Sequence, residues 1–204
     1  MKIQGNLLLL AIETYDMNQR YIPAHQFVAK AWANGTTTEL VKYPEESDFL
    51  KRDFIFRIST ATVEAEESTF SDFSGLTRIL VILEGSLTLI HEGRYQKQLS
   101  PYEQDTFDGA WSTRSVGKVR DFNLMFNAQA RGEVRVLSLS SDHVEQIMMT
   151  QKRMVFFVHT GAFILGEHTL EAGSVLDLSE CNSEILDLHC CSTGNVICCA
   201  VEML

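Results

Sequence analysis

Two segments of the chain, residues 79–107 and residues 154–178, share one order of features. Each has an apolar run, a glycine, a second apolar run, another glycine, and a polar turn before a third apolar run. The matched positions are Gly85 with Gly161, Gly93 with Gly166, and Pro101–Gln104 with Glu171–Gly173. Short apolar runs between glycine turns are typical of β-strands, so a unit used twice predicts two packed β-barrels or sandwiches.

The rest of the chain also favours strands. Runs rich in aromatic and β-branched residues, such as FIFRISTATVEA, MVFFVHTGAFILG and NVICCAVEML, recur at short spacing. Helical patterns are weak, and residues 23–32 and 142–149 each predict about two helical turns. The sequence therefore predicts an all-β fold with an N-terminal unit over residues 1–137 and a smaller second unit over residues 138–204, packed into one compact body.

Charge and composition exclude some partners. The 204 residues include 27 acidic and 17 basic side chains, a formal net charge of −10, which argues against nucleic acid because phosphate binding needs clustered Lys and Arg. No stretch reaches the roughly 18 apolar residues of a membrane span, so we expect no membrane partner. The opening MKIQGNLLLLAI predicts a buried strand rather than a signal peptide. The cysteines at 190–191 and 198–199 lack CxxC spacing and predict reduced thiols in a cytoplasmic protein.

The run VRDFNLMF, residues 119–126, places polar side chains inside an otherwise apolar strand. With a period of two, Phe122, Leu124 and Phe126 share one face, whereas Asp121 and Asn123 share the other. The pattern indicates an apolar anchor on one side and either solvent or a polar cavity on the other.

FIFRISTA, residues 54–61, alternates in the same way, with Arg57 and Ser59 on its polar face. Its other face consists of Phe54, Phe56, Ile58 and Thr60. If both polar faces line one barrel, Arg57 and Ser59 meet Asp121 and Asn123. A buried arginine keeps its charge and needs a partner, so we expect Asp121 to be its counter-ion. The pair is then either purely structural, or it leaves arginine donors that bind a carboxylate, with Ser59 and Asn123 adding hydrogen bonds.

Two loop segments add aromatic and polar side chains. AWANGTTTEL, residues 31–40, has Trp32 next to an Asn34–Gly35 turn, and YEQDTFDGAW, residues 102–111, has Phe107 next to an Asp108–Gly109 turn. Asn-Gly and Asp-Gly pairs are turn signals, and on composition alone both segments are ordinary loops.

One histidine lies on a strand after a glycine turn, as in cupin barrels, but the pattern of metal ligands is incomplete. His91 has Leu89 where metal-binding cupins carry a second histidine, and His159 and His168 fall on different predicted strands. A three-histidine or two-histidine-one-carboxylate centre therefore lacks its ligands, and the sequence predicts neither a metal nor another cofactor.

Several segments in fixed order carry a family resemblance. WANGTTTEL, FRISTATVEAEESTFSDFSGLTR, LEGSLTL, FDGAW and VRDFNLM, between residues 24 and 140, resemble the HutD/Ves family in turn. The resemblance implies a metal-free bicupin with RmlC-like jelly rolls. It also implies a regulator in bacterial histidine utilisation that binds a pathway intermediate, such as formiminoglutamate or a related acid, rather than a catalyst.

The resemblance also implies which residues surround the ligand. In that interpretation Arg57 binds the anion, while Asp108 and Asp121 orient the arginine. The remaining ligand-binding positions are Ser59, Asn34, Asn123, Trp32, Thr37, Phe107 and Arg78, and further motif positions include Glu39, Phe70, Phe73 and Met125.

Two other functions stay open. A metal-free isomerase or epimerase needs a general base, for which His91, held by Asp108 or Glu84, is the candidate. A metal-dependent dioxygenase would hold iron or manganese. We expect a small carboxylate as the partner, and we expect apolar edge strands such as NVICCAVEML to permit a homodimer.

Overall fold

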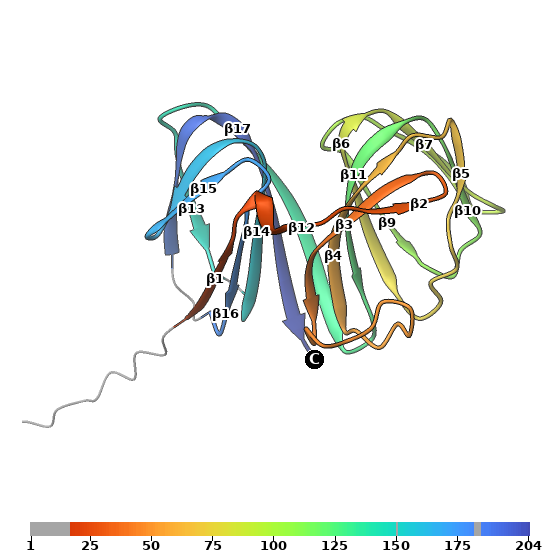
Figure 1. Ribbon diagram of the computed structural model, residues 1–204, viewed down its shortest axis with the longest axis horizontal. Helices are drawn as coiled ribbons and strands as arrows, with labels where there is room; N and C mark the ends of the chain where they lie inside the picture. Colours follow the sequence, from red (N-terminus) through yellow and green to blue (C-terminus); the bar gives the residue numbers. More distant parts are fainter. Residues whose placement is uncertain (1–16, 150, 182–184) are drawn as a thin grey trace, which may run out of the picture.

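The computed structural model describes residues 17–149, 151–181 and 185–204. These residues form strands, turns and one short 3-10 helix, η1 (Ala24–Gln26), arranged as two lobes side by side (Figure 1). The all-β prediction is confirmed. The strand predicted for residues 1–12 lies outside the described residues.

Both predicted helices are wrong. Residues 23–32 contain η1 and strand β2 (Lys30–Trp32), and residues 142–149 contain strand β13 (Val144–Met148). Each of these strands pairs with a long neighbour, β3 (Gly35–Tyr43) or β17 (Ile185–Met203). Backbone pairing along an existing sheet edge outweighs the weak helical preference of such short segments.

The first lobe combines two sheets, drawn in orange to green on the right of Figure 1. One sheet has the order β2-β3-β4-β11-β6-β9 and the other the order β5-β10-β7-β8. Their remaining bounds are β4 (Phe56–Val63), β5 (Glu67–Thr69), β6 (Thr77–Gly85), β7 (Leu87–His91), β8 (Tyr95–Leu99), β9 (Gln104–Asp108), β10 (Thr113–Val116) and β11 (Val119–Phe126). All of these pairings are antiparallel.

The second lobe is one sheet of order β1-β16-β14-β17-β12, with β13 paired to β17 and β15 paired to β14. Its remaining bounds are β1 (Asn18–Ile22), β12 (Ala130–Leu139), β14 (Arg153–Leu165), β15 (His168–Glu171) and β16 (Val175–Ser179). The sheet takes β1 and β12 from the predicted N-terminal unit, so the predicted boundary at residues 137/138 falls inside β12. NVICCAVEML is not an edge strand, because β17 lies between β12 and β14.

The two matched segments have a backbone hydrogen bond in common. In the first lobe the Tyr102 N–H donates to the carbonyl of Ile82, and in the second the Gly173 N–H donates to the carbonyl of Val158, both at 2.7 Å. Ile82 on β6 and Val158 on β14 are therefore equivalent positions, from which the two interiors can be compared residue by residue.

The first matched glycine is required in both copies. Gly85 and Gly161 each have φ of +83°, a backbone conformation that side chains rarely adopt. A Cβ atom would lie 2.4 Å from the Lys118 carbonyl oxygen at Gly85, and 2.7 Å from the Ser192 carbonyl oxygen at Gly161. The repeated motif thus marks a place where two backbones approach too closely for any larger residue.

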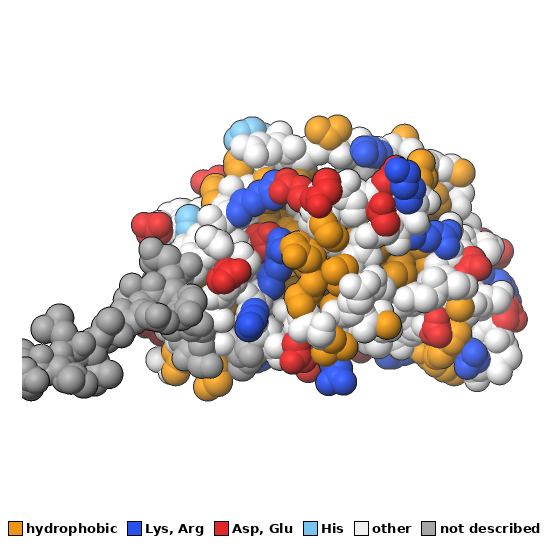
Figure 2. All heavy atoms as spheres, turned by 90° about the horizontal axis from the view of Figure 1, so that it is seen from below, with side chains coloured by type: hydrophobic (Ala, Val, Ile, Leu, Met, Phe, Trp, Pro, Cys, Tyr) orange, Lys and Arg blue, Asp and Glu red, His pale blue; other side chains and the backbone are white. Residues whose placement is uncertain are grey.

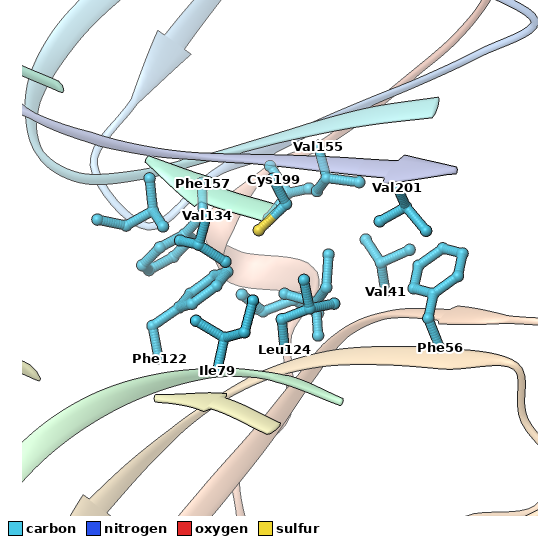
Figure 3. Close-up of a cluster of buried hydrophobic side chains, with 14 of the residues drawn as sticks. Val41, Phe56, Ile79, Phe122, Leu124, Val134, Val155, Phe157, Cys199 and Val201 are labelled. Atoms are coloured by element: carbon cyan, nitrogen blue, oxygen red, sulfur yellow. The ribbon is translucent and has the colours of Figure 1, made fainter. Parts of the chain in front are cut away.

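Apolar faces of the two lobes form a shared core. From the first lobe come Val41, Phe56, Ile79, Phe122 and Leu124, and from the second Val134, Val155, Phe157, Cys199 and Val201, which face one another in Figure 3. Figure 2 shows hydrophobic side chains gathered midway along the lower face, where the lobes meet in Figure 1. The apolar side of VRDFNLMF is therefore the anchor between the lobes.

Two details refine the strand predictions. Phe54 does not follow the alternation of FIFRISTA, because β4 begins at Phe56; instead it packs with Phe73, Leu76 and Met125. Cys198 and Cys199 point to opposite sides of β17, into the second-lobe interior and the core between the lobes, respectively. Among the described helices, none is long and apolar enough to cross a membrane.

Candidate functional site

The polar faces of the two strands meet in one cavity of about 270 Å³ inside the first lobe. Strand β11 lies between β4 and β6, with Asn123 opposite Ser59 on one side and Leu80 on the other. Arg57, Ser59, Asp121 and Asn123 all line the cavity and are all buried. The cavity interpretation of VRDFNLMF is therefore the one that the structure supports.

Arg57 is not paired with Asp121. Its Nε donates to Glu39 Oε2 at 2.9 Å, and its Nη1 donates to Ser59 Oγ at 2.8 Å. The Phe49 ring covers the guanidinium, with 4.5 Å from the guanidinium carbon to the ring centroid. Burial raises the pKa of Glu39, but the hydrogen bond and charge of Arg57, together with Lys42, outweigh it and leave that pKa below its ordinary value. Glu39, on β3 across from Ser59, is the counter-ion that period-two reasoning missed.

Arg78 is as deeply buried as Arg57, with 6% of its surface accessible to solvent, but it lacks polar partners of the kind that Arg57 has. Its guanidinium carbon lies 4.7 Å from the centroid of Phe70, 5.5 Å from that of Phe73 and 5.2 Å from that of Phe107. Its Nε is buried and has no hydrogen-bond partner among the described residues. Burial and the nearby charge of Arg57 lower the Arg78 pKa to about 10, against the opposing effect of Asp121. Aromatic rings thus hold a cation whose donors are uncommitted.

Asp121 and Asn123 occupy the same wall. Burial raises the pKa of Asp121 to about 7, and the positive charge of Arg78 only partly opposes this. No described residue donates a hydrogen bond to the Asp121 carboxyl, and the buried Oδ1 of Asn123 also lacks a donor. Buried polar atoms without partners are rare and each calls for an explanation, such as a bound molecule.

The remaining predicted site residues separate into two groups. Trp32, Thr37 and Arg78 line the cavity, whereas Phe107 lies behind Arg78 as part of its aromatic cradle. Asn34 and Asp108 do not line it. Asn34 donates to Ser68 Oγ at 3.1 Å, and the exposed Asp108 accepts from the backbone N–H of Ala110.

Three aromatic residues complete the apolar walls. Phe49 comes from the loop between β3 and β4, and Phe70 and Phe73 come from the loop between β5 and β6. Phe70 and Phe73 are motif positions of the family, but Phe49 has no signal of its own in the sequence. Its place follows from loop packing, since its ring lies 5.8 Å from Phe73 and 6.4 Å from Phe54.

His91 has other partners than the predicted Asp108 or Glu84. It is buried, with Nε2 at 3.0 Å from Asp105 Oδ2 and Nδ1 at 2.8 Å from Thr113 Oγ1. Glu84 instead lies 3.2 Å from Nε2 of His159, across the junction of the lobes. Neither Asp108 nor Glu84 holds His91, and His91 does not line the cavity. In the described parts of the chain, no three His, Cys, Asp or Glu side chains gather as a metal site.

Comparison with known proteins places the fold and its family. The HutD family matches residues 24–198. The chain belongs to the HutD family. An uncharacterized 21.2 kDa protein in the hutC 3′ region of Pseudomonas putida is 30% identical over 112 residues, which cover 52% of this chain and 57% of that protein. The match thus spans just over half of that relative.

Solved structures agree on the architecture. HutD from Pseudomonas fluorescens SBW25 (formate condition) has 20% identity and a TM-score of 0.76, covering 92% of this chain and 100% of that one. The bacterial pirin YhhW from Escherichia coli, in complex with nickel(II), has 11% identity and a TM-score of 0.71, covering 92% and 100%. The fold of this HutD-family chain is therefore cupin-like.

Proposed function

We propose that this HutD-family protein binds a small carboxylate or formimino acid in the first-lobe cavity and acts as a sensor or regulator of histidine utilisation. The observation that carries the proposal is the buried Arg78, which has no ion pair with a described residue and lies in the same aromatic-walled cavity as Arg57. A buried guanidinium without an ion pair is costly, and a ligand carboxylate removes that cost through charge-assisted hydrogen bonds.

The size and lining of the cavity support a small ligand. Its volume of about 270 Å³ is close to the lower end of the range for small-molecule sites, roughly 300–1,000 Å³. Apolar and aromatic walls with a few buried polar groups are typical of such sites. The position of a P. putida relative in the hutC 3′ region supports the assignment to histidine utilisation.

A thermal-shift screen tests the proposal. The panel is urocanate, formiminoglutamate, glutamate, formate and sugar phosphates, measured on the wild type, Arg57→Ala and Arg78→Met. A ligand at about 100 times its Kd stabilises a protein by about 2.7 kcal/mol, which raises Tm by several degrees. We expect a shift with at least one acid in the wild type, which both variants reduce and the exposed control Arg131→Met retains. No shift with any acid would contradict the proposal.

One observation supports an enzyme as a second candidate. Asp121 is a buried carboxyl in the cavity with a pKa raised to about 7, as suits a general base. A metal-free isomerase would exchange a substrate C–H proton with solvent. Incubation of the same acids with the protein in D₂O, followed by proton NMR, would show deuterium incorporation that Asp121→Asn abolishes. Unchanged spectra would remove this candidate and leave the binding proposal standing.

A further inference from the structure

The charged groups of the cavity differ in how far they are already engaged. Arg57 is bound by Glu39 and Ser59, so its charge is compensated inside the protein. Arg78 has aromatic contacts but no hydrogen bond or ion pair with a described residue, and its Nε is one of the buried unpartnered atoms. An anion that enters the cavity therefore gains most from Arg78.

While Asp121 is ionised, its negative charge repels that anion. Its carboxyl and Asn123 Oδ1 share one face of β11, and both are hydrogen-bond acceptors. A ligand carboxylate would place further acceptors beside the Asp121 carboxyl and Asn123 Oδ1, two acceptors to which no described residue donates. A proton on Asp121 changes this, because its O–H then donates to the ligand oxygen or to Asn123 Oδ1, and the repulsion between two carboxylates disappears.

We propose that the cavity binds a small acid as an anion on Arg78 together with one proton taken up by Asp121. The proposal rests on the binding function proposed above and specifies its charge balance. The proton comes from solvent and bonds to an Asp121 oxygen as the anion enters, so the cavity gains no net charge. Because the pKa of Asp121 in the empty cavity is about 7, Asp121 already carries this proton at lower pH, and the uptake that accompanies binding occurs above about pH 7.

The other charged groups around Asp121 are engaged in pairs or lie outside the cavity. On β3 and β4, Glu39 forms ion pairs with both Lys42 and Arg57. Behind Phe107, the β9 carboxyl of Asp105 accepts hydrogen bonds from His91, Tyr95 and Lys97. The groups that remain on β5, on β10 and on the loops at either end of β5 are exposed: Glu66, Glu67, Asp72 and Arg114. Asp121 is thus the titratable group of this region whose pKa is set by its burial in the cavity.

Formate is the probe, because its own charge is constant from about pH 6 to about pH 9. We would titrate the wild type calorimetrically at several pH values, in two buffers of different ionisation enthalpy. The expected result is an affinity that falls about tenfold per pH unit above about pH 7, with a buffer-dependent enthalpy that reports uptake of about one proton. This measurement needs no variant.

Four variants assign the groups. Asp121→Asn keeps the shape of the protonated carboxyl, so it should bind formate with an affinity independent of pH and of buffer. Asp187→Asn, an exposed carboxyl of the second lobe, should behave as the wild type. Arg78→Met should lose formate binding by at least tenfold more than Arg57→Met.

Two results would overturn the inference while leaving the binding function in place. One is wild-type formate affinity and enthalpy that depend on neither pH nor buffer. The other is a greater loss in Arg57→Met than in Arg78→Met. Absence of binding by formate and by every other acid of the screen would instead contradict the proposed function itself.

Discussion

Equivalent positions in the two lobes carry opposite chemistry. Two and four residues before the matched pair Ile82 and Val158, the inward side chains are Leu80 and Arg78 on β6, but Phe156 and Met154 on β14. On the neighbouring strands, Asp121 and Asn123 of β11 lie opposite Ile82 and Leu80, whereas Val196 and Cys198 of β17 lie opposite Val158 and Phe156. The side chains of the second-lobe interior are apolar, although Met154 and Cys198 border a hollow of about 320 Å³ beside β12 and β13, whereas the first lobe holds a cavity with buried charged and polar walls.

We expect the second-lobe interior to contribute mainly to stability, and the first-lobe cavity to serve binding at the expense of stability. Closely packed apolar side chains stabilise the folded protein through burial. A cavity lacks some of these packing contacts and removes charged groups from water, and both lower the stability. Sites of this kind are tolerated when the rest of the fold supplies the stability, here the second-lobe interior and the core between the lobes. The following predictions test that division.

The largest expected effect is on packing. Leu176 in the second lobe and Leu80 in the first are each 1% accessible, so they form a matched pair. Leu176→Ala should lower the free energy of unfolding by about 4 kcal/mol, because it creates a void in a filled interior. Leu80→Ala should cost only about 2 kcal/mol, because it enlarges a cavity that water can enter. Urea denaturation measures both, and equal losses would mean that the two interiors are packed alike.

The next effect is a pH dependence that only the first lobe has. Because the folded-state pKa of Asp121 is raised to about 7, the folded protein retains a proton that the unfolded chain loses near its ordinary pKa of about 3.9. Stability from this group is therefore fully present below about pH 4 and is lost as pH rises to about 7, by up to about 4 kcal/mol in total.

Asp121→Asn isolates that contribution. Its unfolding free energy relative to the wild type should rise between about pH 4 and about pH 7 and then level off. Denaturation curves at a series of pH values provide the comparison. A difference that stays constant over this range would show that Asp121 is ionised in the folded protein.

A smaller change in the free energy of unfolding is expected when a second-lobe residue replaces its equivalent in the first lobe. Arg78→Met places the side chain of Met154 at the equivalent position, and replacing a buried charge by an apolar group should raise stability by about 1 kcal/mol. The response to acids should be lost at the same time. A variant that is less stable than the wild type would indicate that Arg78 holds the lobe together rather than serving a ligand.

The smallest effect concerns the counter-ion of Arg57. Glu39 is 36% accessible, so solvent screens its ion pair. Glu39→Gln should cost about 0.5 kcal/mol of unfolding free energy near neutral pH. Since its pKa is depressed, the wild-type advantage should be present at neutral pH and disappear as pH falls below about 4. A loss of several kcal/mol would show that Arg57 depends on Glu39 for its place in the fold.

Much of this arrangement could be predicted from alternation alone. Period two in VRDFNLMF separates the apolar anchor at Phe122 from the cavity wall at Asp121, and the same period places Arg57 and Ser59. Alternation alone does not predict which residues pair across neighbouring strands. The Arg57–Glu39 contact depends on the register of β3 against β4, which contains a bulge between Glu39 and Val41. The position of Phe49 depends on a loop, and the exchange of β1 and β12 into the second sheet depends on long-range pairing.

Amide NMR during a formate titration compares the lobes within one experiment. If the first-lobe cavity is the binding site, resonances of Ser59, Leu80 and Asn123 should shift with formate concentration, while Phe156 and Cys198 at corresponding second-lobe positions remain unchanged. Shifts concentrated in the second lobe, or none in the first at saturating formate, would contradict the assignment of binding to the polar cavity.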